Sequence, residues 1–230
     1  MIINNNKMPN EVLIAGGAGF IGSHLCKKLL QEGNKVFCLD DFSTGQRKNI
    51  EKFLSEKNFT LIEQNLCDDI EHEFKNLSMI FNFACPASPV HYQRIPIETL
   101  KVCTLGIFKI VALAKKYNSK IIHSSTSEVY GDPKEHPQTE NYWGNVNSYG
   151  PRACYDEGKR CAEAILYESS KNRQLDIRIL RIFNTYGPNM AINDGRVVSN
   201  FIVQALKNED ITIHGQGKQT RSFQYISDLL

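Results

Sequence analysis

Tyr155 and Lys159 are the residues of this sequence whose types and spacing best suit proton chemistry. Residues four apart lie on one face of a helix, so an ammonium group there can lower the pKa of a phenol. A tyrosine titrates at about pH 10 unaided and needs such a cation to act as a base at neutral pH. Thr126, from a separate serine- and threonine-rich segment, supplies a hydroxyl that would complete a proton relay. We also expect Lys159 to hold a cofactor ribose.

Three glycines, Gly16, Gly19 and Gly22, stand between a short apolar segment and a predicted helix. Glycines at this spacing permit a tight turn and let backbone N–H groups approach a pyrophosphate at the helix N-terminus. Asp40 ends the next apolar segment, where a carboxylate accepts hydrogen bonds from the adenosine ribose. Because a carboxylate repels a 2′-phosphate, the pattern predicts NAD rather than NADP.

The elements that must position these groups alternate between short apolar runs and helical periodicity. This alternation predicts an α/β fold, a Rossmann-type doubly wound parallel sheet. The predicted strands are Glu11–Ala15, Lys35–Leu39, Thr60–Gln64, Met79–Ala84, Lys120–His123 and Asp176–Ile182. The predicted helices are one after Gly22 to about Gln31, a weak one between Gln64 and Met79, Pro96–Tyr117, and one from Gly150 to about Asn172.

From Asn184 the alternation breaks and turn residues become frequent. We expect one helix, Val197–Lys207, and one strand, Ile211–His214, in a smaller C-terminal substrate domain. Ser227 is typical of an N-cap that opens a further helix. The chain is therefore expected to stop within an element, with this domain truncated.

The composition excludes several classes of function. A net charge of +2 gives no reason to expect nucleic acid or an anionic membrane surface as a partner. No apolar run is long enough to span a membrane, and the asparagine-rich residues 1–10 lack the apolar core of a signal peptide. Seven cysteines without a CxxC motif indicate reduced thiols in the cytoplasm. The histidines show no metal-ligand spacing, and we expect no metal.

Several blocks of sequence together resemble a known family. The glycine-rich start, Ser124-Ser125-Thr126 and the Tyr155–Lys159 pair are similar to the extended branch of the short-chain dehydrogenase/reductase superfamily. The resemblance narrows to the UDP-glucuronate decarboxylases and covers nearly the whole chain from Glu11. The blocks that carry it are Ala84–Pro89, Ser125–Pro133, Gly150–Arg160, Arg181–Pro188, Asp194–Phe201 and Gln219–Tyr225.

The resemblance implies a reaction at carbon 4 of the sugar of UDP-glucuronate. Tyr155 would remove the hydroxyl proton while hydride passes to NAD+, and Lys159 would lower the pKa of this tyrosine. Thr126 would hydrogen-bond the reacting oxygen, and Glu128 would order the sugar ring or its proton transfer. Carbon dioxide would leave from the 4-keto intermediate, and return of the hydride would give UDP-xylose. A turn at a strand end for Thr126 and a helix cap for Glu128 are the structural alternatives.

Ser127 separates two activities within the superfamily. The related 4,6-dehydratases resemble this segment but place Asp at this position, because expelling a hydroxyl from carbon 6 needs a general acid. Decarboxylation expels carbon dioxide and needs no acid there. A small neutral side chain also avoids repelling the substrate carboxylate, so Ser127 favours a decarboxylase.

The resemblance also implies two sets of binding residues. Those expected to bind NAD are Gly16, Gly19, Phe20, Ile21, Gly22, Asp40, Asp41, Phe42, Ser43, Asn65, Leu66, Phe83, Cys85, Tyr155, Lys159, Thr185 and Arg196. Those expected to bind the UDP-sugar are Pro86, Ser88, Lys101, Asn184, Val198 and Arg221. Ordinary surface positions are the alternative for Lys101, Arg196 and Arg221. Three positions depart from the family pattern: Asn65, where Asp is usual, Cys103, where Asn is usual, and Ala191, where His is usual.

These expectations define two regions, an NAD-binding Rossmann domain over residues 1–183 and a partial nucleotide-sugar-binding region over residues 184–230. The family continues past Leu230 with an arginine for the sugar carboxylate and a lid, so we expect this chain to bind NAD but to show little activity. Apolar surface is expected on Phe201, Ile202 and Phe223.

A homodimer is the expected assembly. In the extended branch the helix bearing the tyrosine pairs with the one like Pro96–Tyr117 across a two-fold axis. The outward apolar residues expected on the two helices are Leu105, Phe108, Ile165, Leu166 and Tyr167. The alternative functions are a UDP-sugar 4-epimerase or 4,6-dehydratase of the same superfamily, and a non-catalytic nucleotide-sugar binder.

Overall fold

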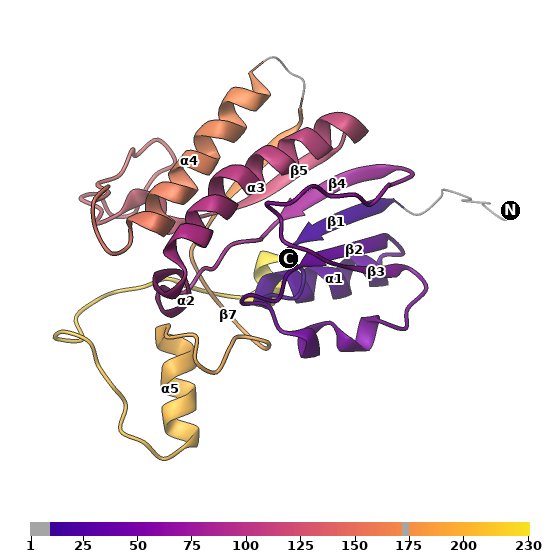
Figure 1. Ribbon diagram of the computed structural model, residues 1–230. Coiled ribbons are helices and arrows are strands. Elements are labelled where there is room, and N and C mark those ends of the chain that lie inside the picture. Colours follow the sequence, from indigo (N-terminus) through magenta and orange to yellow (C-terminus); the bar gives the residue numbers. More distant parts are fainter. Residues whose placement is uncertain (1–9, 172–174) are drawn as a thin grey trace, which may run out of the picture.

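The structure, a computed structural model, describes residues 10–171 and 175–230 (Figure 1). Its centre is a six-stranded parallel sheet of order β3-β2-β1-β4-β5-β6. The strands of this sheet are β1 (Glu11–Ala15), β2 (Lys35–Asp40), β3 (Phe59–Glu63), β4 (Leu77–Asn82), β5 (Lys120–Thr126) and β6 (Ile177–Ile182). The α-helices are α1 (Phe20–Gln31), α2 (Pro89–Arg94), α3 (Pro96–Tyr117), α4 (Ala153–Ser170), α5 (Val197–Leu206) and α6 (Ile226–Leu229). The Rossmann-type sheet and its six predicted strands are confirmed.

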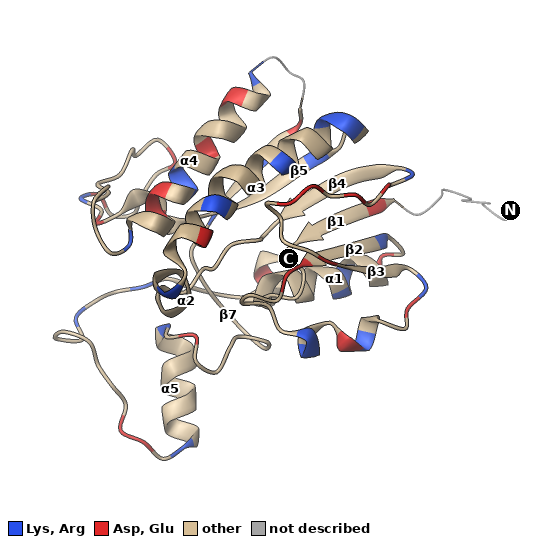
Figure 2. Ribbon diagram, in the orientation of Figure 1, with Lys and Arg blue, Asp and Glu red and all other residues tan. Residues whose placement is uncertain are grey.

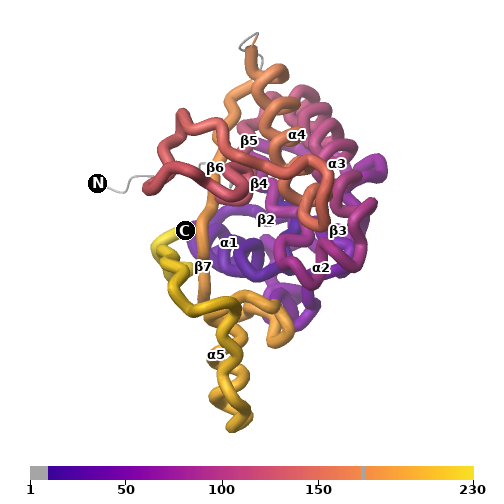
Figure 3. Tube along the Cα trace, turned by 90° about the vertical axis from the view of Figure 1, so that its left-hand side faces the viewer, coloured from indigo at the N-terminus to yellow at the C-terminus, as the bar shows by residue number. Residues whose placement is uncertain are grey.

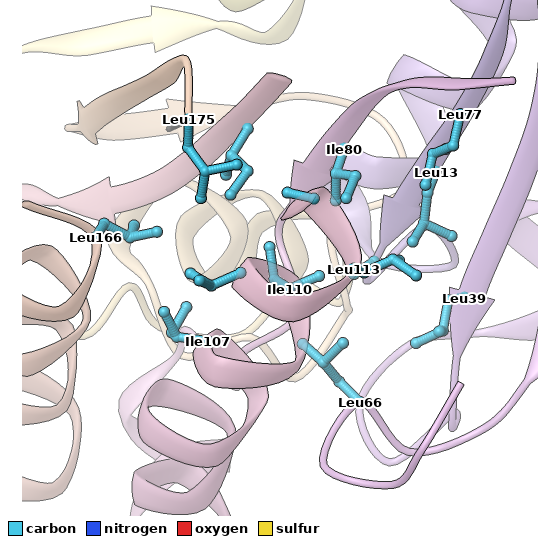
Figure 4. Close-up of a cluster of buried hydrophobic side chains, with 14 of the residues drawn as sticks. Leu13, Leu39, Leu66, Leu77, Ile80, Ile107, Ile110, Leu113, Leu166 and Leu175 are labelled. Atoms are coloured by element: carbon cyan, nitrogen blue, oxygen red, sulfur yellow. The ribbon is translucent and has the colours of Figure 1, made fainter. Parts of the chain in front are cut away.

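β1 lies near the middle of the sheet, and all five of its residues are buried. Successive side chains of a strand face opposite sides, so a strand covered on both faces needs a continuous apolar run. Leu13 packs into a cluster with α3 and α4, where Figure 4 shows it near Ile80 and Leu77. Ile14 packs into a second cluster, with Leu25 of α1. One strand therefore anchors helices on both faces of the sheet.

The order of the strands creates a crevice at one edge of the sheet. β2 and β3 lie on one side of β1, while β4, β5 and β6 lie on the other. The chain leaves β1 towards α1 and leaves β4 towards α2 and α3, which cover the opposite face. In sheets of this kind the loops after the two strands diverge, and ligands bind in the crevice between them.

α3 and α4 pack along each other on one face of the sheet (Figure 1). α3 has Pro96 in its first turn and ends at Asn118, whose φ of 53° is left-handed, so its predicted bounds are confirmed. The predicted helix to about Asn172 corresponds to α4, although Asn172 lies outside the described residues. Leu166 was expected on an outward face of the helix, and this prediction is wrong. Its side chain is 0% exposed, because it packs in the cluster beneath α3.

Residues 184–230 form a smaller region with few buried side chains. Its strands β7 (Asn184–Tyr186) and β8 (Phe223–Tyr225) pair in parallel, and α5 extends away from the sheet (Figures 1 and 3). Figure 2 shows that α5 carries no charged residue between its ends. The expected apolar surface is confirmed at Ile202 and Phe223, while Phe201 is half-buried.

Two predicted elements are wrong, and a third has a different start. Residues 211–214 form no strand, since the backbone N–H of Thr212 bonds the Gln204 side chain rather than a neighbouring strand. Residues 65–76 form no helix, because the Glu11 carboxylate binds the backbone N–H groups of Lys75 and Asn76 at 2.7 and 2.9 Å. The helix expected after Ser227 is present, but its first residue is Ile226, two residues earlier than an N-cap at Ser227 implies.

Among the residues that the structure describes, no helix combines the length and the apolar character that crossing a bilayer requires. The first nine residues of the asparagine-rich start lie outside this range.

Candidate active site

A cavity of about 690 Å³ opens where the strands of the sheet end. Its walls come from the loops after β1, β2 and β4, the end of β5, and the N-terminal half of α4. This is the crevice that the strand order produces. The three groups of residues singled out in the sequence, the glycines, Asp40 and the Tyr155–Lys159 pair, all line it.

The glycine loop after β1 leaves no room for side chains. Gly16 has a φ of +78°, and a Cβ on it would lie 2.7 Å from the backbone of Phe83 and Ala84. A Cβ on Gly22 would lie 2.1 Å from the Gly16 carbonyl oxygen. Gly19 caps α1, so the N-terminus of this helix faces the cavity. A bare backbone beside a helix N-terminus is suited to a pyrophosphate.

Asp40 is fixed at the end of β2 and is only 7% exposed. Its two carboxylate oxygens accept hydrogen bonds from the backbone N–H groups of Ala18 and Phe42, both at 2.9 Å. Burial raises the pKa of this carboxyl group, and the two N–H groups oppose that shift. The carboxylate therefore has a set position at the cavity wall, as a ribose ligand requires.

Asn65 lies at the same end of the cavity as Asp41. Its amide nitrogen donates to Asp41 Oδ2 at 2.7 Å, and its amide oxygen accepts from the backbone N–H of Cys67 at 2.9 Å. An amide oxygen has two lone pairs, so this arrangement leaves capacity for one further donor. Such a donor is what an adenine amino group would supply.

Tyr155 is 5% exposed and stacks on Tyr92 of α2, with ring centroids 4.9 Å apart and an interplanar angle of 5°. Burial raises the pKa of its hydroxyl strongly, while a hydrogen bond to the Thr126 side chain and the charge of Arg196 lower it. The ring is therefore held in one orientation beside the threonine expected to complete the relay.

Lys159 lies beside Tyr155, and its expected effect on the pKa of this tyrosine stays a prediction. Its ammonium group donates to the Ser124 carbonyl oxygen at 2.7 Å and lies 5.9 Å from the centre of the tyrosine ring. Helical spacing brought the two side chains to one face, but the ammonium binds the strand end instead. Arg196, from a distant part of the sequence, is a further cation whose charge lowers the pKa of Tyr155.

Glu128 follows β5 and forms an ion pair with Arg152, which also lies 3.4 Å from Asp156. The backbone N–H of Glu128 donates to Thr126 Oγ1 at 3.2 Å, so the turn expected as an alternative for Thr126 is present. The positive charge of Arg152 offsets the negative charges of Glu128 and Asp156. The net negative charge at this part of the site is therefore lower than these two carboxylates alone would give.

Arg196 precedes α5 and is held by a two-pronged ion pair with Asp194, one contact of which measures 2.7 Å. Both residues line the cavity, and Asp194 is 5% exposed. Arg196 therefore lies at the cavity wall, and its role in binding stays a prediction. A guanidinium fixed in this way is a ready partner for phosphate oxygens.

The structure brings most of the predicted site residues to the wall of this cavity. Those that line it are Gly16, Gly19, Phe20, Ile21, Gly22, Asp40, Asp41, Ser43, Asn65, Leu66, Phe83, Cys85, Pro86, Ser88, Lys101, Thr126, Ser127, Glu128, Tyr155, Lys159, Asn184 and Arg196. Ser88 is buried, and its hydroxyl caps α2 by accepting from the His91 N–H at 3.3 Å.

Four predicted residues do not line the cavity. Phe42 packs in the cluster beneath α1 and against the Arg47 guanidinium. Thr185 is 4% exposed within β7, and Val198 lies in the first turn of α5. Arg221 lies instead in a second cavity of about 1080 Å³, which shares Ser127, Glu128, Arg152, Phe183 and Asn184 with the first.

Sequence reasoning missed two residues that shape the site. Tyr92 supports the Tyr155 ring, and Arg152 neutralises Glu128. Arg152 stood within a family block, whereas an aromatic residue such as Tyr92 in a short helix gives no sequence signal of its own. Within residues 10–171 and 175–230, no three His, Cys, Asp or Glu side chains gather as metal ligands would.

Residues 12–230 match the NAD dependent epimerase/dehydratase family. The chain belongs to this family. UDP-glucuronic acid decarboxylase 1 of Xenopus tropicalis is 50% identical over 226 residues, which make up 98% of this chain and 53% of that protein. UDP-glucuronic acid decarboxylase 2 of Arabidopsis thaliana is 49% identical over 220 residues, or 96% of this chain and 49% of that protein. The chain thus spans about half the length of these curated relatives, and the resemblance that the sequence indicated is confirmed.

Solved structures of the same family share the fold. UDP-N-acetylglucosamine 4-epimerase from Methanobrevibacter ruminantium, in complex with UDP-N-acetylmuramic acid, superposes with a TM-score of 0.85 at 31% identity, over 96% of this chain and 70% of that chain. dTDP-glucose 4,6-dehydratase from Bacillus anthracis, in complex with NAD, superposes with a TM-score of 0.82 at 26% identity, over 96% and 69%.

Proposed function

We propose that the protein converts UDP-glucuronate to UDP-xylose, with NAD regenerated in the site. The observation that carries the proposal is the buried group of Tyr155, Lys159 and Thr126 at the end of a glycine-lined crevice, with the neutral Ser127 beside it. Sequence identities of 50% and 49% to proteins named UDP-glucuronic acid decarboxylases support this choice within the family. Because the chain spans about half their length, activity, substrate and partners are all part of the proposal.

The crevice fits NAD. Side chains at Gly16 and Gly22 would collide with backbone, so a pyrophosphate can approach the loop closely, and Asp40 is fixed where it suits a ribose without a 2′-phosphate. NAD bound there supplies a hydride acceptor that later returns the hydride, and a positively charged ring that favours ionisation of a phenol. The residues proposed to hold it are the lining members of the set expected from the sequence.

Tyr155 would take the proton of the hydroxyl group on carbon 4 of the sugar. Burial raises the pKa of this tyrosine, so it needs positive charge nearby to act as a base. Arg196 contributes such charge, and the Thr126 hydroxyl shares the proton. Lys159 would hold the nicotinamide ribose from its fixed position at the end of β5.

Once carbon 4 is a ketone, the carbonyl lies β to the substrate carboxylate, and loss of carbon dioxide leaves a stabilised enolate. No acid is needed at the leaving group, which suits Ser127. The ion pair between Glu128 and Arg152 limits repulsion of the substrate carboxylate. Reprotonation of the enolate and reduction of the ketone complete the conversion to UDP-xylose.

The UDP-sugar is proposed to extend from Tyr155 towards residues 184–230. Pro86, Ser88, Lys101 and Asn184 line the first cavity, while Arg221 lines the second cavity that joins it. This arrangement supports a division into an NAD-binding domain, 1–183, and a nucleotide-sugar-binding region, 184–230. Residues 1–9 and 172–174 of the first domain lie outside the described residues.

The test is incubation of the protein with UDP-glucuronate and identification of the products. The expected products, formed at the low rate anticipated for this chain, are UDP-xylose and carbon dioxide in equal amounts, without net reduction of NAD. A 4-epimer of the substrate would favour the epimerases that share the fold, and a 4-keto-6-deoxy product from a UDP-hexose would favour a dehydratase. Binding of NAD and UDP without turnover would favour a non-catalytic binder.

We also propose a cytoplasmic homodimer. The seven cysteines are all free thiols, which supports a reducing compartment. Leu105 and Phe108 of α3 and Tyr167 of α4 are 50%, 56% and 61% exposed, so each of these adjoining helices carries exposed apolar side chains. A two-fold axis beside these helices would build a four-helix interface.

Phe108→Asp is expected to convert the dimer to a monomer in sedimentation velocity, because it places a charge in the proposed interface. Leu54→Asp, at an exposed apolar residue outside the two helices, is the control. A wild-type chain that sediments only as a monomer would contradict the proposal.

A further inference from the structure

Cys85 and Cys103 bring two thiols together at the wall of the cavity. Cys85 follows β4, Cys103 lies in the middle of α3, and their sulfur atoms are 3.4 Å apart. Cys85 lines the cavity and is partly exposed, whereas Cys103 is only 2% exposed. Two residues 18 positions apart in sequence thus form one side-chain pair.

The packing of α4 keeps the Cys103 side chain in place. A Cβ added to Gly158 would lie 3.1 Å from Cys103 Cβ and 3.3 Å from its sulfur, so α4 approaches α3 closely at this point. Any larger residue at Gly158 would press on Cys103. The pair is therefore set by the contact of two long helices and not by a flexible loop alone.

The surroundings make Cys85 the more reactive partner. Burial raises the pKa of its thiol, but the hydrogen bond from Cys103 and the charge of Lys159 outweigh it and bring the pKa below its ordinary value. The pKa of Cys103 is raised, first by its contact with Cys85 and also by burial. A thiol of lowered pKa that reaches the cavity, beside a thiol of raised pKa, is the usual arrangement of an attacking and a resolving cysteine.

A second pair in the same chain gives an internal contrast. Cys26 and Cys38 also contact each other, and both are 0% exposed in the cluster beneath α1. Burial and the contact with Cys38 raise the pKa of Cys26. These two thiols are close together, but neither is accessible to solvent. They should therefore stay reduced under conditions that oxidise an accessible pair.

We propose that Cys85 and Cys103 are a site of reversible oxidation by peroxides, which closes a disulfide at the wall of the active-site cavity. The Cys85 thiolate attacks one peroxide oxygen, breaks the O–O bond and becomes a sulfenic acid as hydroxide leaves. The Cys103 sulfur then attacks the sulfenic sulfur and releases water. In total two thiols lose two electrons and two protons, and hydrogen peroxide becomes two molecules of water.

The disulfide would alter the site directly. A sulfur–sulfur bond is about 2.05 Å long, so the two atoms must approach each other by about 1.4 Å. Cys85 belongs to the segment that includes Phe83, Pro86 and Ser88 on the cavity wall, and it packs against the cluster of Tyr155 and Tyr92. A shift of this size near reacting groups lowers turnover by about 10²-fold. This consequence rests on the proposed function; the formation of the bond does not.

The experiment treats the reduced protein with hydrogen peroxide, blocks remaining thiols with N-ethylmaleimide, and maps the peptides by mass spectrometry. Wild type, Cys103→Ser and Cys38→Ser are compared, and NAD affinity and turnover are measured before treatment, after it, and after dithiothreitol. We expect a Cys85–Cys103 linked peptide in wild type and in Cys38→Ser, and none in Cys103→Ser. NAD affinity and turnover should fall with its formation and recover on reduction.

Absence of the linked peptide in wild type, or Cys85 trapped as a sulfenic acid beside a reduced Cys103, would overturn the proposal. A linked peptide that leaves both NAD affinity and turnover unchanged would overturn its effect on the site. If the reduced protein shows no turnover at all, the proposed function fails, while the peptide map still decides whether the disulfide forms.

Discussion

The sheet region and residues 184–230 differ sharply in how they are held. In β1 all five residues are buried, and α4 places Leu166 at 0% exposure in a core shared with α3. In the second region Ser199 is the buried residue of α5, and Leu206 of the same helix is 83% exposed. The same kinds of apolar residue therefore build a core in one region and surface in the other.

This difference in packing parallels the different roles that we propose for the two regions in the site. Thr126, Tyr155 and Lys159 stand on β5 and α4, which the core of the sheet holds in place. Thr185 and Val198, predicted from the second region, do not line the main cavity. The residues proposed to transfer the proton are thus held by a dense core, whereas the region proposed to bind the nucleotide-sugar has little packing of its own.

The largest expected effect concerns the prearranged part. Tyr155→Phe should lower turnover by ~10²–10⁴-fold, because it removes the hydroxyl that moves the proton. NAD affinity should change little, since the glycine loop and Asp40 are untouched. Tyr167→Phe, at an exposed tyrosine of the same helix, is the control for a lost hydroxyl. More than half of wild-type turnover in Tyr155→Phe would remove this residue from the mechanism.

The same substitution in the two regions tests the difference in packing. Leu166→Ala should destabilise the fold by about 2–5 kcal/mol, because it opens a cavity in a closed core. Leu206→Ala, at an exposed site, should change stability by less than about 0.5 kcal/mol. Denaturant unfolding measures both. Similar values for the two variants would show that α5 is packed as firmly as α4.

The pH dependence of NAD affinity tests the carboxylate at the end of β2. Asp40 is proposed to accept hydrogen bonds from ribose hydroxyls, which an ionised carboxylate accepts more strongly than the protonated acid, and burial raises its pKa above the ordinary 3.8. Affinity should therefore fall as the pH drops through this raised pKa, starting at a higher pH than an exposed aspartate would give. Asp40→Asn should bind more weakly and lose this dependence, while Glu32→Gln, at an exposed position, should keep it. An unchanged profile in Asp40→Asn would contradict the assignment.

The smallest effect is expected where the structure corrects the sequence. Thr185 is buried within β7, and its hydroxyl donates to the Phe183 carbonyl oxygen at 3.4 Å. Thr185→Val should therefore change NAD affinity by less than about two-fold. Arg196→Ala, from the same region but at the cavity wall, should weaken binding more strongly. Calorimetric titration of both variants with NAD measures these affinities. A larger loss of affinity in Thr185→Val than in Arg196→Ala would show that Thr185 binds NAD after all.

Local patterns in the sequence were sufficient for the six strands of the main sheet, for both ends of α3, and for the glycine loop. These features depend on residues close in the chain: buried strands need continuous apolar runs, and Gly22 needs the absence of a side chain beside Gly16. Helical spacing also placed Tyr155 and Lys159 on one face. The strand predicted at residues 211–214 was wrong because a strand needs a neighbour, which a local pattern cannot provide.

Only the tertiary structure decided what surrounds these groups. Tyr92 stacks on Tyr155, Arg152 neutralises Glu128, and Cys85 meets Cys103, each through elements that the sheet brings together from separate parts of the chain. The raised pKa of Tyr155 has the same origin. Burial and the charge of a distant arginine act through space, so they depend on which elements lie side by side and not on spacing within one helix.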